Sequence, residues 1–446
     1  MQTADVNRLP VTLDHPPYVL RARLLTPLAD GGTRFLDDAL IEVDAGGLLA
    51  RVEPWPSFGG ADGMSHVDAR PLLVMPGLVD LHAHLPQWPN AGLGAGLDLL
   101  TWLRRYIFPL EREFHADAAR RLAPLFYRAL AAAGTTTVLA YGAVFEDSTD
   151  AAFAAAQQHG VRLVLGKVMM DRLRYDEALA DKDVLDQSLA QSQRLIERWH
   201  GADSGRLQYA VTPRFAVSCS AQMLRESADL ARSTGAYWQT HLAEDRNEIE
   251  EVGRLFPEAL DYTDVYDRAG ALGPRSLVAH AVHLSEREVA RLSETGTRIA
   301  HCPSSNLFLA SGAMPLARYC DAGMVVGLGS DVAGGPDLSI FGEMRAASYT
   351  QSGRRTMLGD VEPPMKPFDW LRLGSFEGAR ALGLDDVIGS IERGKEADFI
   401  CVDASATAPL DGDAVDEAEE ICSRLIYRTR PQMIRGAWVR GRRLPD

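Results

Sequence analysis

The sequence has few cysteines, and they do not cluster. It contains five in 446 residues, and no Cys-x-x-Cys pair occurs. Disulfide-stabilised secreted domains and structural zinc knuckles need cysteines in even numbers or in close pairs, so neither is indicated. The five are Cys219, Cys302, Cys320, Cys401 and Cys422.

Long apolar runs are also missing. No stretch approaches the roughly 20 apolar residues that are needed to cross a bilayer. The segment Met1–Pro10 mixes acidic and polar side chains and lacks the apolar centre of a secretory signal. We therefore expect a cytoplasmic protein with no membrane partner.

A surplus of basic residues is the third absence. Lys and Arg number 46 against 61 Asp and Glu, which gives a formal net charge of -15. Proteins that bind nucleic acids or anionic membranes do so through excess positive charge, so we expect neither as a partner. The hydrophobic content of 46% is that of an ordinary globular protein with a large core. A small-molecule ligand remains compatible with this composition.

From about residue 120 the sequence repeats one pattern, in which a helix-like segment ends at a glycine and a short apolar or β-branched run follows. Glycine adopts the left-handed conformation that commonly closes a helix, so each glycine predicts a helix end before a strand. Ser285 and Glu288 match the capping box of a helix start. The glycines are Gly134, Gly160, Gly235, Gly296 and Gly323.

The pattern yields eight strand candidates. They are expected to end near His84, Gly142, Met169, Arg214, His241, His283, Cys302 and Asp331. Alternating strands and helices predict a parallel sheet, and eight such units close as a TIM-like (β/α)8 barrel in an α/β protein. Active sites of this fold lie at the carboxyl ends of the strands, where several of the histidines and Asp331 occur.

The two ends of the chain differ from its middle. Residues 39–43 and 48–52 flank a glycine-rich link and predict a hairpin, and strand patterns recur after residue 389. Two β-rich ends that flank a barrel are expected to pair as one small β-sandwich domain. The predicted division is 1–71 and 387–446 for this domain and 72–386 for the barrel.

Two histidines follow the strongest apolar run. The run Leu72–Asp80 leads into His82 and His84, whose side chains point the same way because side chains alternate along a strand. Two imidazoles on one side of a strand end form half of a transition-metal site, although such a pair also fits a hydrogen-bonded strand end. His241 and Asp331, at the ends of other predicted strands, favour the metal.

Three imidazoles and one carboxylate suit Zn²⁺ and also Fe²⁺. Glu244, three residues after His241, can transfer a proton from a metal-activated water, although a lone Glu there also fits a helix first turn. His280 is placed to hold that water or a leaving group.

The fourth strand tip, Ala210–Phe215, has no Lys or Glu, and Lys167 lies one strand early, so we expect one metal. The remaining histidines that we singled out, His115, His283 and His301, are expected to be structural or exposed.

Seven segments are similar to those of a known family. They are Pro76–Gln87, Leu100–Pro109, Gly166–Asp171, Val211–Phe215, His241–Arg246, His301–Leu307 and Gly329–Gly335. On these segments, nearly the whole chain resembles the amidohydrolase superfamily and, within it, the guanine deaminases. The metal-site segments specify the superfamily alone, whereas Pro86-Gln87 and Pro213-Arg214-Phe215 specify the purine branch.

The resemblance implies a mechanism. A single zinc is held by His82, His84, His241 and Asp331, and hydroxide attacks C2 of guanine. Glu244 relays the proton to N3 with the assistance of Asp331, so that ammonia leaves and xanthine forms. The resemblance also implies a homodimer and a place in purine catabolism.

Substrate contacts are implied as well. Gln87 and Arg214 read the polar edge of the purine, Phe215 contributes to the wall against the ring, and His280 lies near the reacting carbon. The guanidinium fork of Arg214 suits a carbonyl edge. Taken alone, Arg214 also fits an ion-paired arginine and Gln87 a loop amide. Departures from the family pattern that bear on the shape of the pocket occur at Ala83, Trp88 and Pro336.

Two alternatives stay open. The first is a deaminase of another amino-heterocycle, such as a triazine, a pterin or cytosine. The second is a non-catalytic barrel that serves as an interaction scaffold. Loss of metal ligands would mark a scaffold, and none is lost here.

Overall fold

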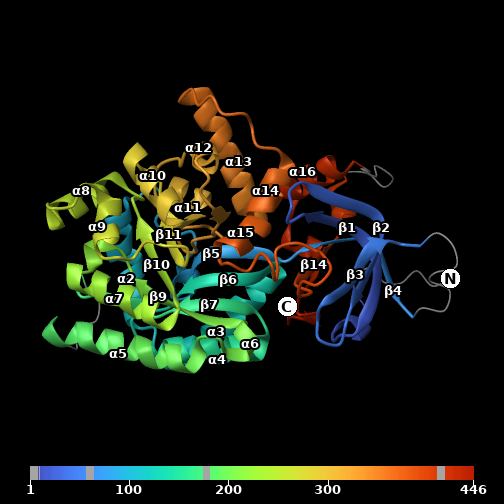
Figure 1. Cartoon of the computed structure of the whole chain (residues 1–446), viewed down its shortest axis with the longest axis horizontal. Helices are drawn as coiled ribbons and strands as arrows, with labels where there is room; N and C mark the ends of the chain where they lie inside the picture. The colour runs from blue at the N-terminus through green and yellow to red at the C-terminus, as the bar shows by residue number, and fades with distance from the viewer. Residues whose placement is uncertain (1–8, 10, 57–64, 174–180, 409–416, 446) are drawn as a thin grey trace.

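The computed structural model describes residue 9 and residues 11–56, 65–173, 181–408 and 417–445, which fold into a barrel with a separate sheet beside it (Figure 1). Among the described residues, eight parallel strands pair in the order β13-β12-β11-β10-β9-β7-β6-β5, and the short β8 pairs with β9. The strands are β5 (Leu78–His84), β6 (Thr135–Tyr141), β7 (Arg162–Gly166), β8 (Val168–Met169), β9 (Leu207–Pro213), β10 (Tyr237–Leu242), β11 (Ser276–His280), β12 (Arg298–His301) and β13 (Val326–Leu328).

Backbone hydrogen bonds connect the last strand to the first. The N–H of Asp331 donates to the carbonyl of His82 at 2.7 Å, and the N–H of His84 donates to the carbonyl of Val332 at 3.1 Å. The segment after β13 therefore runs beside the carboxyl end of β5. The predicted TIM-like barrel of an α/β protein is confirmed.

Helices surround the barrel, and their ends follow the predicted glycine pattern. Gly160, Gly235 and Gly296 close their helices with φ of 98°, 72° and 69°. The capping box of Ser285 and Glu288 is also present. The helices are α1 (Leu99–Trp102), α2 (Phe108–Arg112), α3 (Ala116–Ala132), α4 (Glu146–His159), α5 (Asp181–Trp199), α6 (Ala202–Gly205), α7 (Ala221–Thr234), α8 (Arg246–Leu255), α9 (Tyr262–Arg268), α10 (Glu286–Thr295), α11 (Pro303–Phe308), α12 (Leu316–Asp321), α13 (Ile340–Met357), α14 (Pro367–Leu373), α15 (Phe376–Ala381) and α16 (Ala418–Arg428).

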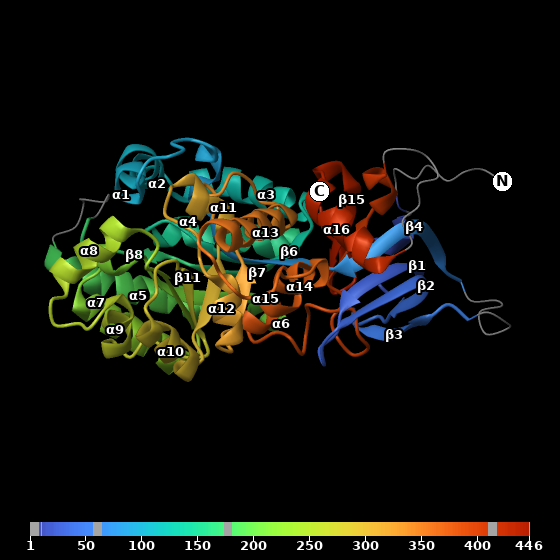
Figure 2. The same cartoon turned by 90° about the horizontal axis from the view of Figure 1, so that it is seen from above.

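The second sheet is built from both ends of the chain, which Figure 2 shows as blue and red strands to one side of the barrel. Its strand order is β16-β15-β14-β4-β1-β2-β3, so the predicted pairing of both chain ends in one β unit is confirmed, and the strands form one hydrogen-bonded mixed sheet of seven. The predicted hairpin is the antiparallel pair β2–β3. The strands are β1 (Tyr18–Pro27), β2 (Thr33–Val43), β3 (Leu49–Pro54), β4 (Val67–Pro76), β14 (Phe399–Val402), β15 (Ile434–Val439) and β16 (Arg442–Arg443).

Three details differ from the predicted strand boundaries. β13 ends at Leu328, three residues before the predicted Asp331, which has a positive φ of 46°. The apolar run Leu72–Asp80 is divided at Gly77, because β4 pairs within the terminal sheet and β5 within the barrel. β11 ends at His280, three residues before the predicted His283, because His280 and Ala281 have positive φ of 70° and 50°, which bends the chain out of the sheet. The exact limits of the two domains stay a prediction.

No helix in the described part of the chain is long and apolar enough to cross a membrane. Apart from Leu9, the segment Met1–Pro10, for which we predicted no secretory signal, lies outside the described residues.

Candidate metal and substrate site

Four side chains converge at the carboxyl ends of β5, β10 and β13. The Nε2 atom of His84 lies 3.2 Å from Nε2 of His82 and 3.2 Å from Nε2 of His241. One oxygen of Asp331, Oδ1, lies 3.1 Å from His82 Nε2 and 3.3 Å from His84 Nε2. All four residues are buried. Donor atoms from three segments that are far apart in the sequence thus face one point.

Neighbouring groups orient these donors. Nδ1 of His241 donates to the carbonyl of Arg214 at 2.6 Å, which leaves the lone pair of Nε2 directed at the cluster. The hydroxyl of Ser305 donates to Asp331 Oδ2 at 2.5 Å, so Oδ1 remains for the cluster. Burial lowers the pKa of His84 to about 4. Burial would raise the pKa of Asp331, but its contacts with His82 and His84 hold that pKa well below the usual value. A metal ion binds neutral imidazoles and an ionised carboxylate, which are the protonation states that these pKa shifts favour.

His280 and Glu244 lie next to this cluster. His280 Nε2 is 3.4 Å from Glu244 Oε2 and 3.9 Å from Asp331 Oδ2. Nδ1 of His280 bonds to Oδ1 of Asn306 at 2.9 Å, and Ser311 Oγ donates to Glu244 Oε1 at 3.1 Å. Burial, followed by the charge of Asp331, raises the pKa of Glu244 well above its usual value. A carboxyl group in this state can both take and give a proton.

Metal-ligating atoms of His82, His241, His280 and Asp331 lie within 4.8 Å of one another. His280 therefore competes with His84 as a fourth ligand on distance alone. The sequence prediction had put His84 in the metal set and His280 beside the substrate.

The predicted substrate residues belong to the same buried region as the cluster. Gln87 follows β5 in the 3-10 helix Leu85–Asn90, and Arg214 and Phe215 follow β9. All three are buried. The guanidinium of Arg214 lies over the ring of Phe108, 5.3 Å from its centroid. One cavity is lined by these three residues together with Glu244 and His280.

This cavity is small and has an apolar cover. Its volume is about 20 Å³, which is room for about one water molecule. Three of the converging residues, His84, His241 and Asp331, also line it, and the remaining lining residues are Leu99, Trp102, Leu103 and Leu309. A heterocyclic substrate is larger than this volume, so its binding requires a rearrangement of the lining.

Several residues of the site escaped the sequence analysis. Glu111 is fully buried and forms an ion pair with Arg214, with Oε2 2.5 Å from Nη1. The sequence around it, Leu110-Glu111-Arg112-Glu113, is typical of an exposed helix turn, so no local pattern indicates burial. Ser305 and Ser311 were missed for the same reason, since a lone serine carries no positional signal.

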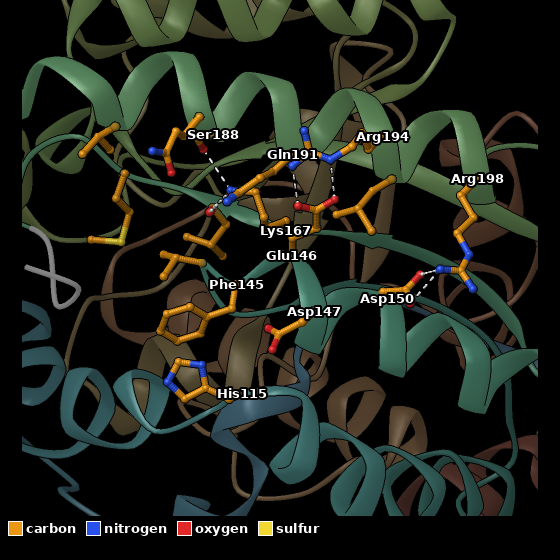
Figure 3. Close-up of a pocket in the computed structure, with 16 residues that line it drawn as sticks. His115, Phe145, Glu146, Asp147, Asp150, Lys167, Ser188, Gln191, Arg194 and Arg198 are labelled. Carbon is orange, nitrogen blue, oxygen red and sulfur yellow. Dashed lines mark hydrogen bonds and ion pairs between the residues drawn. The ribbon is translucent and has the colours of Figure 1, made fainter. Parts of the chain in front are cut away.

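Lys167 lies in a second cavity of about 650 Å³ between β7, α4 and α5, which Figure 3 shows. Its Nζ donates to Ser188 Oγ at 2.9 Å and to the carbonyl of Val168 at 3.5 Å, so it faces α5 and not the converging histidines. Burial lowers its pKa to about 7. The expectation of a single metal ion stays a prediction.

The three histidines set aside in the sequence analysis lie outside the converging donors. His115 packs against the ring of Phe145, with centroids 4.0 Å apart. His283 donates from Nε2 to the carbonyl of Ser311 at 2.7 Å. His301 is fully buried at the end of β12, and burial lowers its pKa to about 3.

Comparison with known proteins identifies relatives across nearly the whole chain. The amidohydrolase family matches residues 73–444. The guanine deaminase of Escherichia coli is 36% identical over 431 residues, which cover 94% of this chain and 90% of that protein. The structure of guanine deaminase from C. acetobutylicum with bound guanine is similar with a TM-score of 0.89 at 28% identity, covering 96% of this chain and 100% of that one. An adenosine deaminase from Xanthomonas campestris with bound zinc has a TM-score of 0.80 at 27% identity, covering 96% and 93%.

Proposed function

The chain belongs to the amidohydrolase family, among its guanine deaminases, and from that premise we propose that it hydrolyses guanine to xanthine and ammonia. The observation that carries the proposal is the convergence of His82, His84, His241 and Asp331 beside a cavity that also contains Gln87, Arg214 and Glu244. The identity to guanine deaminases over most of the chain supports the same substrate.

We assign one zinc ion to His82, His84, His241 and Asp331. Ligand atoms that bind one zinc ion at about 2.0–2.1 Å lie about 3.0–3.4 Å apart, and with four protein ligands a fifth position remains for water. The separations of 3.1–3.3 Å among these four residues match that spacing. His241 keeps its proton on Nδ1, where it donates to the carbonyl of Arg214, so its Nε2 lone pair is available to a cation. His280 stands 3.9 Å from Asp331, which supports a place beside the ligands.

A zinc ion bound by these residues would lower the pKa of a water molecule and so supply hydroxide near neutral pH. Glu244 can take one proton from the attacking water and deliver it to the ring nitrogen next to the reacting carbon, which makes that carbon more electrophilic. The second proton of the water then passes to the amino group, so that ammonia leaves as the new carbonyl forms. The raised pKa of Glu244 suits this exchange, since a strongly acidic carboxyl would not hold the proton. Asp331 assists as a second buried carboxylate, and His280 lies within 3.4 Å of Glu244 to orient the reacting groups.

Gln87 and Arg214 bind the polar edge of the purine, and Phe215 contributes to the wall against its ring. Each of these side chains is buried and lines the cavity. A preorganised arginine and amide give hydrogen bonds that an apolar pocket cannot, so the site discriminates between heterocycles by their edge groups.

Ammonia release from purified protein tests the proposal, with guanine assayed beside adenine, cytosine, a pterin and a triazine. We expect release from guanine alone, loss of activity after treatment with a chelator, and recovery with one equivalent of zinc. Activity on another amine with none on guanine would reject the assigned substrate while keeping the hydrolytic chemistry. Metal analysis that found no stoichiometric metal in active protein would reject the zinc site.

The cytoplasm, a homodimeric assembly and a role in purine catabolism are further proposals that follow from the family resemblance. Light scattering coupled to size-exclusion chromatography measures the oligomeric state directly.

A further inference from the structure

Glu111 contacts both of the side chains that we assign to the polar edge of the substrate. Its Oε1 accepts a hydrogen bond from Gln87 Nε2 at 2.7 Å, and its Oε2 accepts one from Arg214 Nη1 at 2.5 Å. Gln87 follows β5, Arg214 follows β9, and Glu111 itself belongs to α2. One fully buried carboxylate thus connects three elements at the cavity.

The carboxylate determines which way the Gln87 amide faces. An ionised carboxylate paired with a guanidinium only accepts hydrogen bonds, so the amide can bond to it through Nε2 alone. Oε1 of Gln87 is then directed away from Glu111. Among the described residues Oε1 has no hydrogen-bond partner, and Gln87 lines the small cavity. The amide therefore offers an acceptor to the substrate, while Arg214 next to it offers a cationic donor.

We propose that Glu111 is a positioning residue that sets substrate specificity by holding Gln87 with Oε1, and Arg214 with its guanidinium, toward the substrate. Guanine carries a ring N–H next to a carbonyl, which complements an acceptor beside a donor. 2-Aminopurine carries the same amino group on the same carbon, but has a bare ring nitrogen and no carbonyl at this edge. The acceptor on Gln87 and the donor on Arg214 therefore pair with the edge of guanine, whereas the edge of 2-aminopurine leaves them unpaired. This inference rests on the proposed function, because it takes guanine as the substrate.

Glu111→Gln tests the direction of the amide. The guanidinium of Arg214 only donates, so the new amide at position 111 turns its oxygen to Arg214 and its NH₂ group to Gln87. Gln87 must then reverse its own amide and present N–H groups to the cavity. We expect kcat/KM for guanine to fall about 10- to 100-fold, while the value for 2-aminopurine changes little, so that the ratio of the two falls at least about tenfold.

The double variant Gln87→Glu, Glu111→Gln exchanges the two groups and restores the acceptor. The amide at position 111 can then give its oxygen to Arg214 and its NH₂ group to the new carboxylate at position 87, which presents oxygen to the cavity. We expect the double variant to regain most of the guanine to 2-aminopurine ratio that the single variant loses. A residue that served only to stabilise the fold would not be rescued in this way.

Equilibrium binding of xanthine, the expected product, gives a second readout that needs no turnover. Xanthine keeps the ring N–H and the neighbouring carbonyl, so we expect Glu111→Gln to weaken its binding about 10- to 100-fold and the double variant to recover it. Calorimetry on both zinc-loaded and metal-free protein measures this. Thermal unfolding and metal content, compared with those of the exposed-site control Glu113→Gln on the same segment, identify variants that fail to fold.

An equal loss for guanine and 2-aminopurine, or a double variant no better than the single one, would overturn the role of Glu111. If Glu111→Gln does not fold, the ratio of kcat/KM for guanine to that for 2-aminopurine is measured instead in the double variant and in Glu111→Asp. Wild-type protein that is inactive on guanine would instead reject the proposed function, independently of the variants.

Discussion

Glu244 shows how a single residue gains a chemical role from its surroundings. Its carboxyl group lies between Ser311 and His280, and burial raises its pKa. In Glu244→Gln the amide keeps the size and the polar contacts but cannot transfer a proton. We expect kcat to fall about 10²- to 10⁴-fold with the metal content unchanged, which paired turnover and metal assays measure. Turnover near that of the wild type would assign the proton transfer to another group.

Burial of Lys167 destabilises the folded protein by an amount that depends on pH. Its pKa is about 7 in the folded protein and about 10.4 in an unfolded chain. Between these values the unfolded chain binds one more proton, so the free energy of unfolding rises with pH by about 1.4 kcal/mol per unit. Lys167→Met should remove this rise and stabilise the protein at pH 7 by about 1–3 kcal/mol.

Urea denaturation at pH 7, 8 and 9 measures both effects of Lys167→Met. The exposed Lys366→Met serves as the control for loss of a lysine charge, and it should leave the slope intact. The difference in the free energy of unfolding between Lys167→Met and the wild type should shrink as the pH rises from 7 to 9, and a constant difference would contradict the titration of Lys167.

At the scale of elements, the junction of β4 and β5 depends on a residue without a side chain. A Cβ at Gly77 would lie 2.0 Å from Thr136 Oγ1 and 2.5 Å from Thr136 Cγ2 on β6. Gly77→Ala should therefore force β5 away from β6 and destabilise the protein by about 1–3 kcal/mol. Loss of activity should accompany the loss of stability, because β5 ends in His82 and His84.

Gly253→Ala is the matched control, since a Cβ there meets nothing within 4 Å and the site is inside α8. Alanine is the better helix former, so this variant should gain about 0.5–1 kcal/mol. Denaturation curves of both variants, measured with urea, provide the comparison. Equal stability of the two would contradict the close contact at Gly77.

Helices and strands were predictable from the sequence where a pattern of neighbouring residues determines them. Glycines that close helices, the capping box at Ser285 and the alternation of strand and helix each depend on neighbouring residues, and they led to the barrel. The division at Gly77 was not predictable, because β4 and β5 form one apolar run in the sequence and only pairing with different sheets separates them. Glu111 was hidden for a similar reason, since its burial depends on Arg214, which is 103 residues away.

At the scale of the whole molecule, the barrel and the terminal sheet share a core. Ile400 and Val402 of β14 and Ala437 of β15 belong to the same buried apolar cluster as Leu78 of β5 and Val138 of β6. Two parts that bury one continuous core lose much of that burial when either one unfolds alone. We therefore expect the chain to unfold in a single cooperative transition.

A buried ion pair crosses the same boundary and gives this expectation a test. Arg162, at the start of β7, donates to Asp398 Oδ2 from Nε at 3.1 Å and from Nη2 at 2.9 Å, and it also pairs with Glu396. Both Arg162 and Asp398 are almost fully buried. Arg162→Met would leave the Asp398 carboxylate without this partner, in surroundings that already raise its pKa by burial. We expect a loss of about 3–5 kcal/mol.

Urea denaturation followed by both fluorescence and circular dichroism measures this loss together with the cooperativity. The control is Arg254→Met, which removes an exposed ion pair with Glu251 on α8 and should change the stability by less than about 1 kcal/mol. If the terminal sheet were an independent unit, Arg162→Met would separate the two probes into successive transitions. Coincident curves shifted to lower urea would instead mean that the sheet and the barrel, with the metal site at its strand ends, unfold as one unit.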